Sequence, residues 1–592
     1  MKKGYSLMKV ESKCGGSLMS AGITSTFITA LAVAVLGYLF WSSVMPVETR
    51  WSHAEILTAR LMPVFCMLGS AFMIFNREGH KIALLDILVL VWGIYYFLRL
   101  YFGNDYPCAT QFLKVSSSLI LYFALRAVFS NCRVRPSTFI ELIMLCGCYE
   151  ALVGVGQILS GASRNYFHML TGTFLNPGPY SAYLLVAVVA GQTGKDVIQC
   201  EVSRLPVAIR KYATVLYYLL LLLPLLVLPS TWSRAAIMAL AIVCLWYYRK
   251  SYWRYRKAVW VLCLVAMVML YFVKRGSADG RVLTWMASLT SLAHNPWLGV
   301  GIGGFRHATA EGIAEMYHSC PDNGLLASAG VAEYAFCDIL KVVVEQGVVG
   351  GLLCLAVAYV ALHNLRRWSA PAFYAMGSLM LFSLFSYPFE LYPFRVLSIT
   401  LLAVSATSSS MAEMDGAKRV MALLFGVLAT AASVFIACED KRRSDADQQA
   451  SLFASMHDVA FVNDFYELLP KESDNSIFLF NFAKTLTSAG RYSESNAMLR
   501  QGALTSNDPM FYLLQGNNYR YMHFYDLAEA AYRKAFAVMP NRLYPLYQLL
   551  TLYRVTGQQG KARQTAAYIL KANAKIKSPA TDEIIRKAKE AL

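Results

Sequence analysis

Two arginines stand in otherwise apolar surroundings, where a charged side chain needs a physical reason. Arg234 follows the sequence PSTWS at the start of a hydrophobic segment, and Arg281 opens the sequence RVLTWMASLTSLAHNPWLGVGIGGF. A guanidinium presents a planar fork of N–H donors that fits phosphate oxygens, and it keeps its charge at physiological pH. Both residues are therefore candidates for a phosphate clamp, although an arginine at a helix end can also simply snorkel to the membrane surface.

Acidic side chains beside another hydrophobic segment could activate a hydroxyl group. The sequence AEYAFCDILKVVVEQGVVGG carries Glu333, Asp338 and Glu345, together with Lys341. Spacings of three and four residues place Asp338, Lys341 and Glu345 on one helical face. An acid inside the apolar slab is a functional candidate by default. The alternative is an Asp–Lys–Glu set that only neutralises itself.

A polar turn precedes a further apolar segment in the sequence TGTFLNPGPYSAYL. Asn176 and the Pro-Gly-Pro that follows predict a turn, and Tyr180 lies on the first helical turn after it. The amides and hydroxyls of this stretch suit a polar ligand at the membrane surface, whereas a plain helix start is the alternative.

The glycine-rich stretch PWLGVGIGGF superficially resembles a nucleotide-binding loop. Such a loop needs a preceding strand and a βαβ unit, and the surrounding sequence predicts neither. We expect the glycines to let the backbone turn tightly against the membrane, with Pro296, Trp297 and Phe305 anchored at the interface.

The elements that must position these residues are membrane helices. Of 592 residues, 57% are hydrophobic and 15% are charged, and the mean hydropathy is +0.44. A membrane helix needs about 20 mostly apolar residues. We read such spans at 24–45, 56–75, 82–103, 112–130, 138–160, 179–194, 212–229, 235–248, 257–273, 339–362, 371–388, 394–410 and 419–437. The predicted fold class is all-α, a polytopic bundle of about 12–13 transmembrane helices with a long outer loop at 274–336.

Orientation follows from lysine and arginine, which gather in every second loop and mark those loops as cytoplasmic. The N-terminus is then cytoplasmic, and the first span is a retained anchor because it is too long for a cleaved signal. The loop 274–336 and everything after the last span lie outside. The net charge of +18 largely reflects this bias, so no nucleic-acid partner is predicted.

Cysteines give little sign of metal or redox chemistry. Most of the 13 cysteines lie in apolar spans, where a thiol behaves as a small hydrophobe. No zinc spacing occurs, and neither a metal nor a cofactor is predicted. Cys320 and Cys337, both predicted outside, could form a disulfide or stay free.

Residues 439–592 differ in character from the membrane domain, residues 1–438, and form a separate helical domain. Units of about 33 to 34 residues recur and resemble tetratricopeptide repeats, which stack into an α-solenoid. Small and aromatic residues would pack the paired helices: Ala528, Ala562, Tyr492, Tyr525 and Tyr532. The domain is either a docking surface for a protein partner or acceptor, or a helical array whose aromatics are only core.

Taken in order, the motifs GTFLNPGPYSAYL, TWSRAA, GRVLTWMASLTSLAHNPWLGVGIGGF and EQGVVG resemble the O-antigen ligase superfamily, over most of residues 140–410. Its members include O-antigen ligases, polysaccharide polymerases and bacterial protein O-oligosaccharyltransferases. The resemblance implies a glycosyltransferase of the bacterial inner membrane, with its repeat domain in the periplasm. It would move a glycan from an undecaprenyl diphosphate carrier in the membrane lipid to a hydroxyl acceptor on lipid A core, a glycan or a protein. No nucleotide sugar or obligatory metal is implied.

The resemblance also suggests roles for single residues. The substrate-binding candidates are Arg234, Arg281, Asn176, Tyr180, Arg306 and Glu345, of which the first two match positions associated with the diphosphate. Many ligases carry a His-Asn pair before the re-entering helix, where this chain has Phe336 and Cys337. The candidate bases are therefore Glu333 and Asp338, which adjoin the motif, and then His318.

Three other functions stay open. A polymerase differs from a ligase only in its acceptor, and outward repeats favour a protein acceptor weakly. A catalytically silent scaffold that presents its repeats would explain the missing histidine. A transporter is least favoured, because no duplicated pattern of broken helices is seen.

Overall fold

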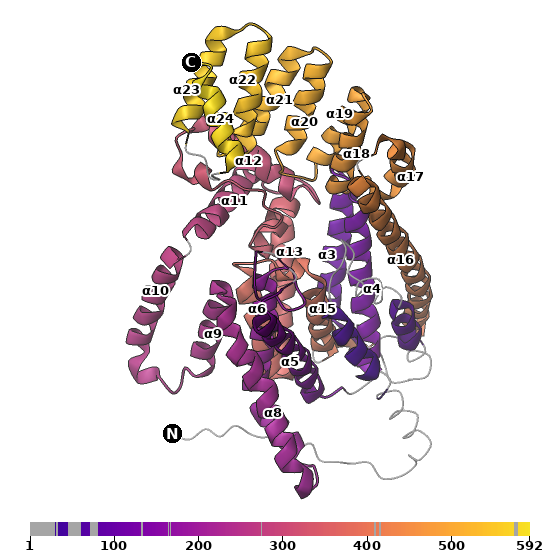
Figure 1. Cartoon of the computed structure of the whole chain (residues 1–592). Coiled ribbons are helices and arrows are strands. Elements are labelled where there is room, and N and C mark those ends of the chain that lie inside the picture. The colour runs from indigo at the N-terminus through magenta and orange to yellow at the C-terminus, as the bar shows by residue number, and fades with distance from the viewer. Residues whose placement is uncertain are drawn as a thin grey trace.

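The computed structural model describes residues 30, 33–44, 61–70, 81–131, 134–163, 165, 167–273, 275–407, 410–413, 416–456, 458–572 and 578–592. Apolar helices make up one part of the molecule and short paired helices make up the other end (Figure 1). The predicted spans 24–45 and 56–75 lie partly outside the described residues, as does the basic start of the chain.

Six helices of the described part are long and apolar enough to cross a membrane, by length and composition. They are α3 (Leu84–Tyr101), α4 (Ala109–Asn131), α5 (Pro136–Ser160), α8 (Val207–Val227), α13 (Asp338–Trp368) and α16 (Gly416–Met456). The others in this part are α6 (Pro177–Thr193), α7 (Lys195–Ser203), α9 (Arg234–Tyr247), α10 (Arg256–Val273), α14 (Ala370–Ser383) and α15 (Tyr392–Thr407). A helix falls in every predicted span from 82–103 onward, so the all-α polytopic class is confirmed. The number of crossings stays a prediction.

At the core of the membrane part, α6 packs against α5, α8, α9 and α14. Nearly all its side chains are buried, as expected for a helix that is apolar on every side. At the opposite end from the repeats, β1 (Lys81–Ala83) pairs antiparallel with β2 (Ser410–Glu413). These strands, which the sequence did not predict, connect the start of α3 to the segment after α15.

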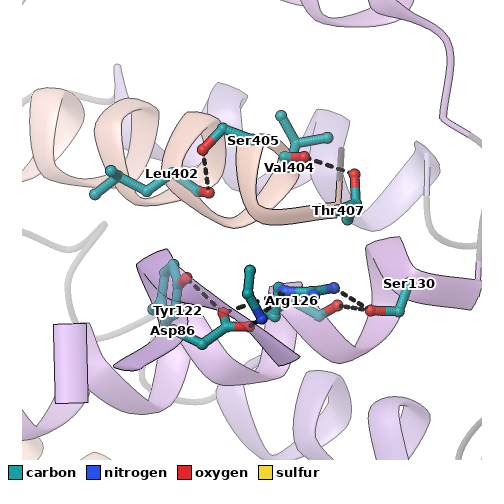
Figure 2. Close-up of polar contacts among 9 residues, drawn as sticks. Asp86, Tyr122, Arg126, Ser130, Leu402, Val404, Ser405 and Thr407 are labelled. Carbon is teal, nitrogen blue, oxygen red and sulfur yellow. Dashed lines mark hydrogen bonds and ion pairs between the residues drawn. The ribbon is translucent and has the colours of Figure 1, made fainter. Parts of the chain in front are cut away.

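A buried ion pair joins α3 to α4 next to this small sheet (Figure 2). Asp86 accepts from Tyr122 at 2.7 Å and from Arg126 Nε at 3.2 Å, and it also caps its own helix by accepting from the N–H of Ala83. On α15, the hydroxyls of Ser405 and Thr407 donate to carbonyls of their own helix (Figure 2). These polar groups therefore have partners, as an apolar surrounding requires.

The outer loop folds into helices. It contains α11 (Arg275–Ala293), α12 (Phe305–Ser319) and the short helix η3 (Gly324–Ser328). Helices α11 and α12 cross closely, because a Cβ on Gly312 would lie only 2.0 Å from the carbonyl oxygen of Ala287. Glycine is required there by contact.

The C-terminal part is a stack of helical hairpins. Its helices are α17 (Val462–Glu472), α18 (Ser476–Ser488), α19 (Tyr492–Ala503), α20 (Met510–Tyr521), α21 (Tyr525–Val538), α22 (Tyr544–Val555), α23 (Gln559–Lys571) and α24 (Pro579–Lys589). First helices of successive hairpins begin at Ser476, Met510 and Tyr544, a period of 34 residues. Ala528, Ala562 and Tyr532 are fully buried as predicted, whereas Tyr492 and Tyr525 are half-buried. A helical repeat is therefore present, and its tetratricopeptide assignment stays a prediction.

Candidate functional site

Several of the predicted motifs meet at the segment that joins α14 to α15, residues 384–390, called here the α14–α15 corner. Arg281 of α11 donates from Nη1 to the carbonyl of Phe385 at 2.7 Å. The turn before α6 reaches the same corner, because a Cβ on Gly178 would lie 4.0 Å from Ser386 Oγ. The sequence analysis did not single out this corner.

Aromatic rings hold the outer loop against the corner. The rings of Tyr334 and Tyr387 are parallel, with centroids 3.7 Å apart, and Phe336 meets Tyr387 edge-on at 5.6 Å. The guanidinium of Arg281 lies over the Phe336 ring, 4.9 Å from its centroid. Phe336 has a φ of 52°, a left-handed conformation that a bulky residue adopts only where its surroundings hold it. The residue in the expected histidine position therefore supports an arginine.

Arg281 and Arg234 lie close enough to affect each other. Arg234 is the first residue of α9, and the Ser233 hydroxyl caps that helix. Burial lowers the pKa of Arg281, and the positive charge of Arg234 lowers it further. The contacts of Arg281 are with a carbonyl and a ring, neither of which neutralises its charge. A guanidinium held in this way near a second arginine suits a doubly charged anion.

Charged residues at the start of α13 are also connected to the corner. Lys341 Nζ pairs with Glu390 Oε1 at 2.6 Å, which contradicts the alternative of an Asp–Lys–Glu set on one helix that only neutralises itself. Burial tends to raise the pKa of Glu390, but the ammonium of Lys341 more than offsets this and lowers the pKa below its usual value. Asp338 is 9% exposed and accepts from the N–H of Phe389 at 3.2 Å.

Helix α13 is broken at Gly347, where φ is 70° and ψ is −174°. The glycine-rich stretch lies in this break: the N–H of Val300 donates to Val344, and that of Val348 donates to Pro296. A Cβ on Gly347 would lie 2.0 Å from the Trp297 carbonyl oxygen. The tight backbone turns are thus confirmed, and their physical reason is a close approach of two backbones.

Glu345 lies beside the break and is 6% exposed. Backbone N–H groups of Gly303 and Phe305, at the start of α12, hydrogen-bond to its carboxylate, where negative charge is favoured by the helix dipole. Glu345 therefore positions α12. Trp297 is 68% exposed, but Phe305 is only 2% exposed and packs with Ala308 and Val344. The prediction that Phe305 lies at the membrane interface is wrong.

Hydrogen bonds to α5 hold the turn before α6. Asn176 caps α6 by accepting from the N–H of Gly178 at 2.9 Å, while Tyr180 is fully buried and donates to the Glu150 carbonyl. The Glu150 carboxylate accepts from Thr173.

On the same face of α5 as Glu150, Gln157 Nε2 donates to the Gly172 carbonyl at 2.7 Å. The sequence analysis missed this pair. The signal was present, because two polar residues seven apart in an apolar span share one face.

The three candidate bases lie in different surroundings. Glu333 is exposed, and its backbone carbonyl accepts from Arg306 Nε at 3.2 Å. Burial of Tyr387 raises the pKa of that residue, and the negative charge of Glu333 raises it further. Asp338 is buried as described above. His318 lines an open hollow of about 390 Å³ with residues that include His294, Glu315 and Lys534. Among the three, Glu333 combines exposure with proximity to the rings at Arg281.

Two further predictions concern cysteine and metal sites. Cys320 and Cys337 are both free, so the predicted alternative of a disulfide between them is wrong. Within the described ranges, no group of three or more His, Cys, Asp or Glu side chains is arranged to hold a metal ion.

Residues 219–355 match the family model described as O-antigen ligase. The matched range includes α9, α11, α12 and the start of α13, and so contains Arg234, Arg281, Phe336 and Glu345. No curated protein matches the chain.

Proposed function

The chain belongs to the O-antigen ligase superfamily through its residues 219–355, and on that premise we propose that it transfers a glycan from undecaprenyl diphosphate to a hydroxyl acceptor outside the membrane. The observation that supports this most is that Arg281, which donates to the α14–α15 corner, lies near enough to Arg234, from a separate motif, to feel its charge. A lipid diphosphate brings the charge that such a pair recognises.

In the proposed reaction, the acceptor oxygen attacks the anomeric carbon of the glycan while the bond from that carbon to the diphosphate oxygen breaks. The departing diphosphate gains negative charge, which Arg234 and Arg281 stabilise. Positioned cations act strongly in a site that excludes water. Arg281 is held in place beforehand by the Phe385 carbonyl and the Phe336 ring, so little reorganisation is needed.

The acceptor hydroxyl must lose its proton to a base within hydrogen-bond reach. Phe336 has no ionisable group and so cannot serve. We assign this role to Glu333, because it is exposed and lies beside the ring cluster that supports Arg281. Asp338 is the second choice, since its carboxylate already accepts from Phe389.

The acceptor can be identified in cells. The gene is deleted, and surface polysaccharide, glycoprotein and lipid-linked glycan are followed together, with complementation by the wild type and by Arg281→Ala. Accumulated carrier-linked glycan with lost glycoprotein indicates a protein transferase, whereas lost polysaccharide with intact glycoprotein indicates a ligase or polymerase. If deletion changes none of the three, the proposed transfer is wrong and a silent scaffold is favoured.

A further inference from the structure

The repeat domain contacts the outer loop through the turns between its hairpins. Asn507, in the turn before α20, donates from Nδ2 to the carbonyl of Ala332 at 2.9 Å. Asn541, in the turn before α22, donates to the carbonyls of Ala327 and Ala329 at 2.9 and 2.7 Å. The two asparagines are 34 residues apart, which is the repeat period. Equivalent positions of successive hairpins therefore make equivalent contacts.

The preceding turn contacts the membrane domain in a related way. Asp474, just before α18, accepts from the N–H of Thr110 at 2.6 Å, where α4 begins. Asp474 is 7% exposed and also pairs with Arg443 of α16. A carboxylate at the N-terminus of a helix is favourably placed. Three consecutive turns thus form one docking edge, which lies along the top of the membrane helices (Figure 1).

Apolar contacts seal this edge. Met539 is 1% exposed and joins a cluster with Leu283 and Ile313 of the outer loop. Ala537 and Val538 of α21 pack with Ala310 and Ala314 of α12. Lys534 forms an ion pair with Glu311, and His307 hydrogen-bonds to the Ala503 carbonyl at 3.0 Å. The repeat domain is therefore packed on the outer loop and does not hang free from α16.

The contacted segment, residues 327–335, is called here the strap. From Ala329 on it forms no helix or strand, so its carbonyls need donors from elsewhere. Asn541 supplies donors to Ala327 and Ala329, and Asn507 supplies one to Ala332. Arg306 then donates to Glu333, and Trp285 donates to Ala335 at 2.9 Å. The strap carries Glu333 and Tyr334 and ends next to Phe336, the ring beneath Arg281.

We propose that Asn507 and Asn541 are positioning residues of the transferase site, and that the repeat domain is a structural part of that site. They hold the strap in register, and the strap in turn sets the position of Glu333 and Phe336. The link to catalysis rests on the function proposed above, whereas the link to the strap does not. Both amides are buried, at 3% and 8% exposure, so water competes little with these hydrogen bonds.

The test uses the full chain in lipid nanodiscs and four variants. Asn507→Ala with Asn541→Ala removes the donors. Asn507→Asp with Asn541→Asp keeps the side-chain shape but turns an acceptor toward the carbonyls. Asn518→Ala is the matched control, because buried Asn518 donates to Ser495 and Asn496 inside the repeat domain and does not touch the strap. Asn541→Asp alone provides a milder variant if either double variant fails to fold.

Hydrogen exchange of peptides covering the strap is the first readout. Losing hydrogen bonds of this kind should increase strap exchange by about tenfold or more, more strongly with Asp than with Ala, and leave the strap unchanged in Asn518→Ala. Equal strap exchange in the wild type and in every folded Asn507 and Asn541 variant would overturn the proposal, as would an equal increase in the Asn518→Ala control.

Glycan transfer is the second readout and separates the two proposals. With the positioning role, the Ala and Asp variants should lose about tenfold or more in kcat with little change in KM for the lipid-linked glycan, while Asn518→Ala keeps its kcat at temperatures below its melting point. If the wild type itself transfers nothing but strap exchange rises in the variants, the proposed function fails and the positioning of the strap stands. Unchanged kcat in an active enzyme with a loosened strap would overturn the catalytic link.

Discussion

Phe336 cannot take the role that a histidine in its position would have. A histidine in its position could carry a proton, whereas a phenyl ring can only orient and desolvate the guanidinium of Arg281, 4.9 Å away. Cation–π contacts of this kind are worth about 0.5 to 2 kcal/mol. The proton must then be taken by a different group, and the nearby exposed carboxylate is Glu333.

We expect Glu333→Gln to lower kcat for glycan transfer by about 100-fold, because a general base contributes roughly that much or more. KM for the lipid-linked donor should change little, since the carboxylate acts on the acceptor. The measurement is a steady-state assay with purified protein. Glu315→Gln serves as control, because Glu315 is also an outer-loop acid but hydrogen-bonds to His294 beside the separate hollow. A kcat for Glu333→Gln within twofold of that control would rule out this base.

At the scale of single residues, the sequence pointed to the arginines as site candidates but not to the residues that hold the site together. Arg234 and Arg281 stand out because charge is unusual in apolar context. The Phe385 carbonyl, the Glu390 partner of Lys341 and the asparagines that bind the strap do not stand out. Each is an ordinary residue far away along the chain, and its role exists only after the helices have packed.

Among the elements, α13 has the least tolerant backbone. Gly347 combines a φ of 70° with a carbonyl 2.0 Å from where a Cβ would be. An alanine at this position would strain the backbone, and its Cβ would clash with the glycine-rich stretch unless that stretch moved. The glycine-rich stretch and the break in α13 are therefore a single structural unit.

Gly347→Ala should destabilise the protein by about 3 kcal/mol or more, and should lower its melting temperature in detergent. The matched control is Gly377→Ala in α14, where a Cβ meets nothing within 4 Å. That change should be neutral or stabilising by about 0.5 to 1 kcal/mol, because alanine favours a helix. Equal melting temperatures for the two variants would show that the break does not need glycine.

The Lys341–Glu390 pair predicts a pH dependence. The pKa of Glu390 is lower in the folded protein than in the unfolded chain, where it is near 4.5. The ionised carboxylate therefore stabilises the fold fully above pH 4.5, and this stabilisation is lost as the pH falls through the lower folded pKa. Glu390→Gln should reduce stability at pH 7 by about 1 to 3 kcal/mol. The variant should also lose less stability than the wild type as the pH falls below 4.5. Thermal unfolding across pH measures both effects.

A control for this experiment is Glu494→Gln, which breaks an exposed pair with Arg491. Surface pairs contribute little, so its melting temperature should stay close to that of the wild type. If Glu390→Gln behaves like Glu494→Gln at every pH, the corner is not held by this ion pair.

The membrane elements were largely predictable, because apolar length is a local property of the sequence. Helix α12 of the outer loop and the strands β1 and β2 were not. Helix α12 has a mixed face that makes sense only with α11 and α21 packed on it. Strands of three and four residues leave no periodic pattern to detect.

For the molecule as a whole, the repeat domain has a different position from the one expected. The sequence predicted a separate domain and left open whether it is a docking surface or only a helical array, whereas one edge of that domain holds the chain's own outer loop. Helix α16, 41 residues long, runs from the membrane part into the repeats without interruption (Figure 1). Sequence periodicity reveals that repeats exist, but not which edge of them is occupied.

The orientation in the membrane that positive charge predicts can be measured with native cysteines. Cys320 lies in the outer loop and Cys200 lies on α7, and both are exposed. In intact cells, a membrane-impermeant maleimide with access to the periplasm should label a variant that keeps only Cys320. A variant that keeps only Cys200 should react only after the inner membrane is permeabilised. The reverse pattern would invert the topology and place the arginine pair on the wrong side.

The most direct test of the proposed chemistry measures release of undecaprenyl diphosphate from a lipid-linked glycan by the purified chain in nanodiscs. Arg234→Ala and Arg281→Ala should each lower the rate by about 100-fold or more, and Arg281→Lys should not restore it, since an ammonium cannot replace the planar fork. Arg249→Ala, which removes an arginine stacked on Trp246 away from the site, should keep the wild-type rate. Near-normal release by both alanine variants of the pair would contradict the account.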